Sequence, residues 1–217
     1  MKKIFILISV ISMLIEVSSY AFENGDFQYW NNESVSLKIK KSWKVTLAEE
    51  FRFGDNSSVL YYEHTDIGIV YSGLAKWLDL GINYRHIYEK NKGKWQLENR
   101  PHFNATFKFS FFDLDLSNRA LFEYRIRKNK HDYWRYRNKL TVKFPLKLTR
   151  FKIQPYTADE IFFDLDKEKV DRNRIYMGFN IKLTDDLQGD IYYMIQSSKN
   201  EKWEHWNIFG TSLKLLF

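Results

Sequence analysis

The side chains best suited to catalysis are few in this chain, and none stands in a catalytic arrangement. The 217 residues include five histidines and no cysteine, which excludes a disulfide framework, a cysteine-ligated zinc site and a cysteine nucleophile. A base and a nucleophile on one face of a strand are two residues apart, and no histidine has a serine at that distance. The nearest pattern is His102-Phe103-Asn104, and an amide is no nucleophile. We therefore predict no catalytic residue, while an enzyme with a differently built site stays as an alternative.

Acidic side chains also lack the arrangement of a metal site. Asp185-Asp186, and Asp164 with Asp166, are short acidic groups of the kind that is common in turns. The sequence contains no glycine-rich phosphate loop. We predict no metal and no cofactor.

Arginines and glutamates, by contrast, recur two residues apart. Glu98 with Arg100 and Arg135 with Arg137 are examples. A guanidinium group binds carboxylates and anionic ligands with the same planar fork, so such residues suit either ion pairs or anion binding. We assign as candidate anion contacts Arg52, Arg85, Arg100, Arg119, Arg125, Arg135, Arg137 and Arg174, and as candidate ion-pair partners Glu50, Glu98, Glu123 and Glu160.

The elements that carry these pairs are predicted to be β-strands. In residues 112–127 one parity is almost wholly apolar and the other almost wholly charged, and residues 94–109 and 133–144 repeat this alternation. The prediction is an all-β fold, an up-and-down antiparallel transmembrane β-barrel of about 10–12 strands. The candidate strands are residues 27–39, 43–53, 61–71, 77–88, 94–109, 112–127, 133–144, 151–164, 172–183, 187–197 and 203–217.

Alternation alone would fit a soluble β-sandwich or a secreted barrel as well as a transmembrane barrel. Several candidate strands are longer than the mean soluble strand of about 5–6 residues, which favours a membrane span. Aromatic residues concentrate near the strand ends, as in the girdles of membrane barrels. The amphipathic last strand ends on Phe217, which resembles the assembly signal of outer-membrane barrels. A secreted soluble β-protein stays as the alternative.

Residues 1–21 have the features of a cleaved signal peptide. Lys2 and Lys3 precede an apolar run at residues 4–15, and Ser19-Tyr20-Ala21 fits the cleavage rule. The run is shorter than the ~20 residues that a membrane helix needs. Residues 22–217 are then predicted to form a single barrel domain in the outer membrane of a Gram-negative-type bacterium. Export argues against a nucleic-acid partner despite the net charge of +7, so the expected partners are outer-membrane lipid, the barrel-assembly machinery and small anionic solutes.

The charged parity is expected to face the lumen, because lipid requires the other parity to be apolar. Between residues 94 and 183 the charged parity holds twelve basic side chains and five acidic ones, and the basic set includes Lys143, Lys152 and Lys182. Asn118 and Asn138 fall on the lipid parity, so we expect them near a membrane interface or at a local bulge.

The connections are expected to alternate in length, with short turns at one end of the barrel and longer loops at the other. The shorter set lies around 40–42, 72–76, 110–111 and 184–186, and 145–150 fits it only loosely. The longer set lies around 54–60, 89–93, 128–132, 165–171 and 198–202. Eleven strands conflict with the even number that is usual for bacterial barrels.

The order and spacing of these elements resemble a family called domain of unknown function 2490, of small outer-membrane β-barrels. The resemblance spans residues 30–217 and is carried by Glu50-Phe51-Arg52-Phe53, Tyr84-Arg85, Glu98-x-Arg100, Arg119 with Glu123-x-Arg125, Arg135-x-Arg137, Pro155-Tyr156 with Glu160, and Asn173-Arg174 with Gly178. It implies an outer-membrane barrel with an interior rich in arginine and glutamate, and it implies no activity. The architecture is also similar to small porins for acidic oligosaccharides, a likeness that assigns no function.

Two functional hypotheses follow. In the first, the barrel is a narrow passive channel for small anionic solutes, and the eight arginines line it. In the second, the barrel is a closed structural or interaction protein, because small barrels are just wide enough for side chains to fill. The two hypotheses differ in whether the lumen is open or packed with ion pairs.

Overall fold

The computed structural model describes residues 24–128, 130–199 and 201–217, so the predicted signal peptide and the predicted start of the mature chain lie outside it. Each of the eleven predicted ranges overlaps with one β-strand of the structure, which confirms the all-β fold. The strands are β1 (Phe27–Lys40), β2 (Trp43–Gly54), β3 (Val59–Ala75), β4 (Leu78–Asn91), β5 (Lys94–Phe111), β6 (Leu114–Arg127), β7 (Tyr133–Lys143), β8 (Gln154–Asp164), β9 (Lys169–Lys182), β10 (Leu187–Lys199) and β11 (Trp203–Leu216). Within the same residues, the structure contains no helix long and apolar enough to cross a membrane.

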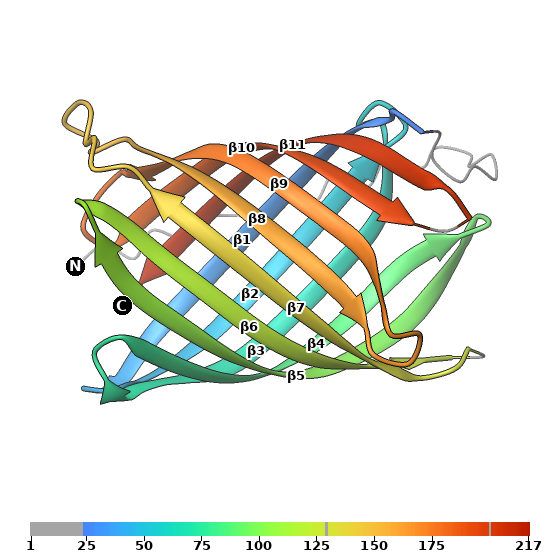
Figure 1. The fold of residues 1–217 in the computed structure, drawn as a ribbon, viewed down its shortest axis with the longest axis horizontal. Coiled ribbons are helices and arrows are strands. Elements are labelled where there is room, and N and C mark those ends of the chain that lie inside the picture. The colour runs from blue at the N-terminus through green and yellow to red at the C-terminus, as the bar shows by residue number, and fades with distance from the viewer. Residues whose placement is uncertain (1–23, 129, 200) are drawn as a thin grey trace, which may run out of the picture.

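The eleven strands close into one barrel (Figure 1). Strands that are consecutive in the chain pair antiparallel, whereas β1 and β11 pair in parallel, from Phe27 opposite Asn207 to Ser36 opposite Leu216. With an odd number of alternating strands, the first and the last run in the same direction. A parallel seam therefore closes the barrel that the described residues form, and it leaves no strand edge unpaired.

The connections at the two ends of the barrel match the predicted lengths only in part. One end, which we call the turn end, carries the connections 41–42, 76–77, 112–113, 144–153 and 183–186 together with Phe217. The other, the loop end, carries 55–58, 92–93 and 165–168, together with the described residues 128, 130–132, 201 and 202 of the two remaining connections. The predicted difference in length holds only in part, because the turn-end connections are mostly the shorter ones but the longest connection, residues 144–153, also lies at the turn end.

The connection 144–153 is a folded hairpin. Leu148 and Ile153 exchange two backbone hydrogen bonds of 2.9 and 2.8 Å between N and O. Thr149 and Lys152 have φ angles of 63° and 47°, which a regular strand does not adopt. Consequently β8 begins at Gln154 rather than at residue 151 as predicted.

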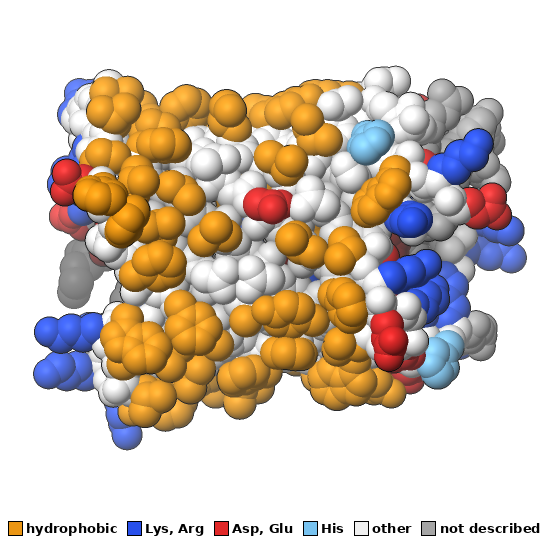
Figure 2. Space-filling model, in the orientation of Figure 1, with side chains coloured by type: hydrophobic (Ala, Val, Ile, Leu, Met, Phe, Trp, Pro, Cys, Tyr) orange, Lys and Arg blue, Asp and Glu red, His pale blue; other side chains and the backbone are white. Residues whose placement is uncertain are grey.

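The outer wall of the barrel is apolar over its middle. Figure 2 shows hydrophobic side chains spread over the wall, with an acidic side chain among them, between two ends where most of the charged side chains gather. Ile82 of β4 is 70% exposed and Met177 of β9 is 71% exposed, while Arg85 and Arg174 on the opposite parity of the same strands point inward. The alternation read from the sequence therefore corresponds to the two faces of one wall.

The side-chain amides of Asn118 and Asn138 hydrogen-bond to each other in this wall. Each donates its amide nitrogen to the other's amide oxygen, at 2.8 and 2.9 Å, and Asn138 also donates to the Tyr136 hydroxyl at 3.1 Å. The register between β6 and β7 is unbroken there, so the pair does not lie at a local bulge, and its position near a membrane interface stays a prediction. The pair meets the hydrogen-bonding needs of both amides without distorting the strands.

We predict that replacing one asparagine of this pair lowers the free energy of unfolding more than replacing both. Asn118→Leu leaves Asn138 with only the Tyr136 hydroxyl, and we expect a loss of about 1–3 kcal/mol of unfolding free energy. Asn118→Leu with Asn138→Leu removes both amides and should recover most of that loss. Urea unfolding in detergent micelles measures both variants. A double variant that is less stable than the single one contradicts the prediction.

Candidate functional site

Charged side chains from five adjacent strands meet inside the barrel, nearer to the loop end. Strand alternation turns them all to the same face of the wall, and the barrel's curvature then brings them together. All but Arg125 are buried. We call this set the lumen cluster, and its members are Glu98 and Arg100 of β5, Glu123 and Arg125 of β6, Arg135 and Arg137 of β7, Glu160 of β8 and Arg174 of β9.

Glu123 is one centre of the lumen cluster and is 1% exposed. Arg135, which lies directly opposite it in the register of β6 and β7, pairs with its carboxylate. Arg137 contacts the same carboxylate, with 3.4 Å between its Nη1 atom and Glu123 Oε2. A buried carboxylate needs such partners, because desolvation would otherwise make its charge very costly.

Glu160 is the second centre and is also 1% exposed. It accepts hydrogen bonds from Arg137 at 2.7 Å and from the Tyr176 hydroxyl at 3.0 Å. Arg174 and Arg119 approach it at 3.5 and 3.4 Å. Since Arg137 contacts both Glu123 and Glu160, the two centres form one network.

Glu98 extends this network toward the loop end. It pairs with Arg100, and it accepts a two-pronged contact from Arg125, with N to O distances of 2.5 and 2.7 Å. Arg125 also donates to the Tyr133 hydroxyl. The paired geometry uses the guanidinium fork fully, which is the arrangement that favours arginine over lysine.

An aromatic ring fills the space between the arginines. Phe162 of β8 is 1% exposed, and the guanidinium carbons of Arg137 and Arg174 lie 4.6 and 4.7 Å from its ring centroid. Those of Arg135 and Arg172 lie at 5.1 and 5.5 Å. Cations at these distances are attracted by the ring face. Phe162 therefore occupies the centre of this part of the lumen.

The facing wall, from β1 to β4, carries a similar arrangement. Arg52 binds Glu50 at 2.5 Å and lies between the rings of Trp30 and Tyr62, at 3.7 and 4.0 Å from their centroids. Asp66 of β3 accepts from Arg85 at 2.8 Å and contacts the His102 Nε2 atom at 2.9 Å.

Two glycines make room for an inward tyrosine near these rings. Tyr192 of β10 lies opposite Gly178 of β9 and Gly210 of β11. A Cβ atom at Gly210 would come within 2.1 Å of the Tyr192 ring, and one at Gly178 within 2.8 Å of its Cβ. The spacing of the strands around Tyr192 thus depends on the missing side chains.

All twelve candidate residues point into the lumen, and each contacts a partner of opposite charge. The ion pairs join the eight arginines to Glu50, Asp66, Glu98, Glu123 and Glu160. Arg119 is the most exposed of the arginines, with 41% of its side chain accessible. Their predicted role as anion contacts stays a prediction, since the same groups already bind carboxylates of the protein.

The sequence analysis did not select Asp66 or Phe162. Both share the inward parity of their strands, at 62, 64 and 66 in β3 and at 158, 160 and 162 in β8, so this parity was the signal that could have identified them. Nothing in the sequence marked Phe162 beyond that parity, because Ile161 and Phe163 on either side of it are apolar as well.

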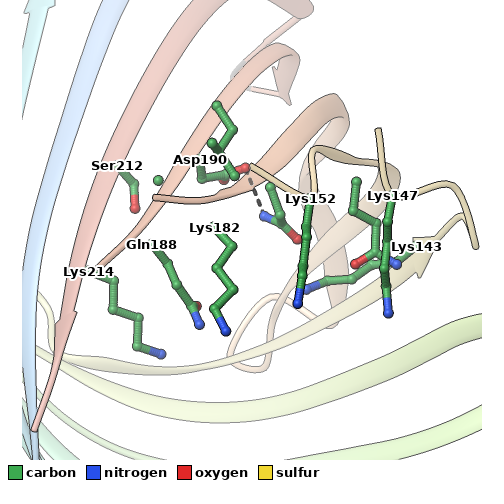
Figure 3. Close-up of a pocket in the computed structure, with 12 residues that line it drawn as sticks. Lys143, Lys147, Lys152, Lys182, Gln188, Asp190, Ser212 and Lys214 are labelled. Carbon is green, nitrogen blue, oxygen red and sulfur yellow. Dashed lines mark hydrogen bonds between the residues drawn. The ribbon is translucent and has the colours of Figure 1, made fainter. Parts of the chain in front are cut away.

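Beyond the lumen cluster, toward the turn end, the lumen widens into a cavity of about 540 Å³ that we call the lysine vestibule. It is lined by Lys143, Lys147, Lys152, Gln154, Asn180, Ile181, Lys182, Gln188, Gly189, Asp190, Ser212 and Lys214. Figure 3 shows the lysine side chains directed into one open space. Of these five lysines, the sequence analysis did not single out Lys147, in a connection, or Lys214, on the inward parity of the last strand.

Carboxylates neutralise little of the charge in the lysine vestibule. Asp190 accepts hydrogen bonds from the Tyr156 hydroxyl at 2.9 Å and from Asn180 at 3.0 Å. Lys182 binds Asp185 at 2.6 Å, and this hydrogen bond, with the charge of Lys182, lowers the pKa of the exposed Asp185 carboxyl. Within the described residues, no carboxylate lies within ion-pair distance of Lys143, Lys147, Lys152 or Lys214.

The histidines and acidic groups form no recognisable metal site. Among the described residues, no three histidine or carboxylate side chains are placed to hold a metal ion. His131 contacts Asp166 at 3.0 Å on the exposed surface. Asp164 accepts the backbone N–H groups of Asp166 and Lys167, both at 3.1 Å, which is a turn-capping role.

Phe217 extends the parallel seam past the last strand. Its backbone N–H donates to Ser36 O at 2.9 Å, and its carbonyl accepts from Lys38 N at 2.7 Å. Its side chain is 66% exposed. Whether this side chain acts as the assembly signal stays a prediction.

One comparison with known proteins gives a match. The model of a family described as "Protein of unknown function (DUF2490)" matches residues 27–207, from the start of β1 into β11. No curated protein and no solved structure gives a significant match to the chain.

We predict that the charge of Glu160 is essential to stability. Glu160→Gln leaves Arg174 without a carboxylate and Arg137 with only its longer contact to Glu123, and we expect a loss of about 3 kcal/mol or more of unfolding free energy. Asp115→Asn is the matched control, because Asp115 is an exposed carboxylate next to the turn end, where the Ser110 hydroxyl donates to it at 3.3 Å. That control should change stability by less than about 1 kcal/mol. Equal urea midpoints for the two variants would refute the prediction.

Proposed function

Since the chain belongs to the DUF2490 family, whose description assigns no activity, we propose a function from its geometry. The protein is an integral β-barrel of a bacterial outer membrane, and the lumen cluster keeps it closed to solutes. It acts as a structural or interaction barrel rather than as an open pore. The observation that carries this proposal is the burial of paired charges across the interior.

The outer face supports the membrane location. Side chains such as Ile67, Ile82 and Met177 are exposed on the middle of the wall, where water would make an apolar belt unfavourable. Trp43, Trp77 and Trp95 are exposed near strand ends, as interfacial tryptophans are. The closed wall has no free edge to expose to hydrocarbon. A secreted soluble protein would face water with the same belt, so we do not favour it.

The inner face supports the closed lumen. A water-filled pore would hydrate the charged groups that line it, whereas Glu123, Arg135 and Glu160 are between 1 and 2% exposed. Phe162 fills the space among the arginines and is equally buried. The carboxylates of the protein occupy the positions that passing anions would otherwise take.

A narrow passive channel for small anions is the second candidate. The lysine vestibule favours it, because five ammonium groups at one mouth would attract anions toward the lumen. Conduction would then require the lumen cluster to rearrange. An enzymatic role has no support from the side chains described above, and the absence of catalysis remains our prediction.

For biogenesis, we propose that the barrel-assembly machinery inserts the chain into outer-membrane lipid. The parallel seam between β1 and β11 would be the last pairing to form, since it joins the two ends of the barrel domain. Phe217 at the end of that seam is our candidate for the assembly signal.

Conductance separates the two candidates. We expect residues 22–217, refolded in detergent, to show heat-modifiable gel mobility and to give no single-channel steps in a planar bilayer. Flotation with liposomes is the control for insertion, because it separates a closed barrel in the membrane from a protein that has not entered the membrane. Discrete steps with an anion-favouring reversal potential would overturn the closed barrel. Arg135→Glu with Arg137→Glu would then test whether the cluster sets that selectivity.

A further inference from the structure

The lysine vestibule lies outside the lumen cluster and is open at the turn end. Six neighbouring segments build it: the end of β7, the connection 144–153, the start of β8, the end of β9, the start of β10 and the end of β11. Its volume of about 540 Å³ is within the usual range of small-ligand pockets. The vestibule can thus accept a compact ligand without any change in the lumen cluster.

The hairpin at residues 144–153 is held in place at the rim of this mouth. Besides the Leu148–Ile153 bridge, Lys182 N donates to Phe151 O at 2.9 Å, which ties the hairpin to β9. Gln154 donates its side-chain amide to Phe144 O at 2.9 Å. Lys147 and Lys152 therefore project from a backbone that is already ordered, which reduces the entropy lost when a ligand binds.

The charge of the vestibule is poorly balanced by the protein. Five lysines line it, and the one carboxylate among its lining residues, Asp190, is already engaged by Tyr156 and Asn180. Like charges crowded in a cavity are stabilised by an anion that several of them share.

The choice of cation differs between the two parts of the lumen. The lumen cluster uses arginines, whose rigid forks are already paired with carboxylates. The vestibule uses lysines, whose flexible, strongly hydrated ammonium groups bind anionic groups without a fixed geometry. This difference suits permanent ion pairs in the first case and an exchangeable ligand in the second.

Neutral polar groups stand among the lysines. Gln154, Gln188 and Ser212 line the same cavity, and amides and hydroxyls hydrogen-bond readily to ligand hydroxyl groups. We propose that the lysine vestibule is a binding site for a compact polyanion that carries several phosphate or carboxylate groups together with hydroxyls. This inference is independent of the closed lumen, because binding at the turn end requires no passage through the lumen cluster.

Calorimetric titration of the refolded chain tests the proposal with three probes. Tripolyphosphate presents phosphate groups alone, trigalacturonate presents carboxylates with hydroxyls, and maltotriose presents hydroxyls without charge. We expect saturable, salt-sensitive binding of at least one of the two anions, and the tighter one identifies the anionic group. No binding of either anion, or equal binding of maltotriose, would overturn the proposal.

A matched pair of variants assigns the binding to the vestibule. Lys147→Gln/Lys152→Gln/Lys214→Gln removes three of its lysines, none of which has an ion-pair partner among the described residues. Lys92→Gln/Lys130→Gln/Lys202→Gln removes the same charge from exposed lysines at the loop end. We expect the first variant to bind the anion about tenfold or more weakly, and the second to stay within about twofold of the parent.

Equal weakening in both variants would mean that general charge attraction, and not the vestibule, holds the anion, and it would overturn the assignment. Heat-modifiable gel mobility confirms that both variants fold. Failure of the closed-barrel proposal appears in a different measurement, as conductance steps in the unmodified chain.

Discussion

A sheet of eleven strands that run alternately up and down can close only if its first and last strands meet in parallel. The seam between β1 and β11 makes that closure through ten facing residue pairs, and Phe217 continues it at the turn end. Closure satisfies the backbone groups that two edge strands would leave open. Closure also creates an inner and an outer face of the wall, so that every second side chain points into a confined lumen.

That confinement explains the ion pairs. A few apolar side chains, including Trp30, Met194 and Ile208, form a small hydrophobic cluster in the lumen, and the rest of the buried interior is largely polar. Charges with so little water must find partners, and Glu123 and Glu160 each collect several guanidinium groups. The barrel interior is in effect a core built from complementary charges and rings.

The lumen is asymmetric along its axis. Toward the loop end, arginines pair with glutamates around Phe162 and leave almost no accessible surface. Toward the turn end, lysines surround a cavity that the hairpin 144–153 helps to line. The first arrangement suits stability and closure, whereas the second leaves charge available for a ligand. On the same inward face, the arginines of the lumen cluster thus serve stability, whereas the lysines of the vestibule are available to bind a ligand.

The sequence by itself determined the eleven strands and the inward parity, because period-two alternation is local and every strand carries its own copy of it. The family resemblance also rested on sequence spacing alone. Pairing between side chains of strands that are not neighbours was decided only by the tertiary structure: Arg119 meets Glu160 across 41 residues of chain, and His102 meets Asp66 across 36. The Asn118–Asn138 pair, the hairpin at 144–153 and the lysine vestibule likewise depend on the register between strands and on the closure of the wall. Alternation says which face a side chain takes, but the register and the curvature decide which other side chain it meets there.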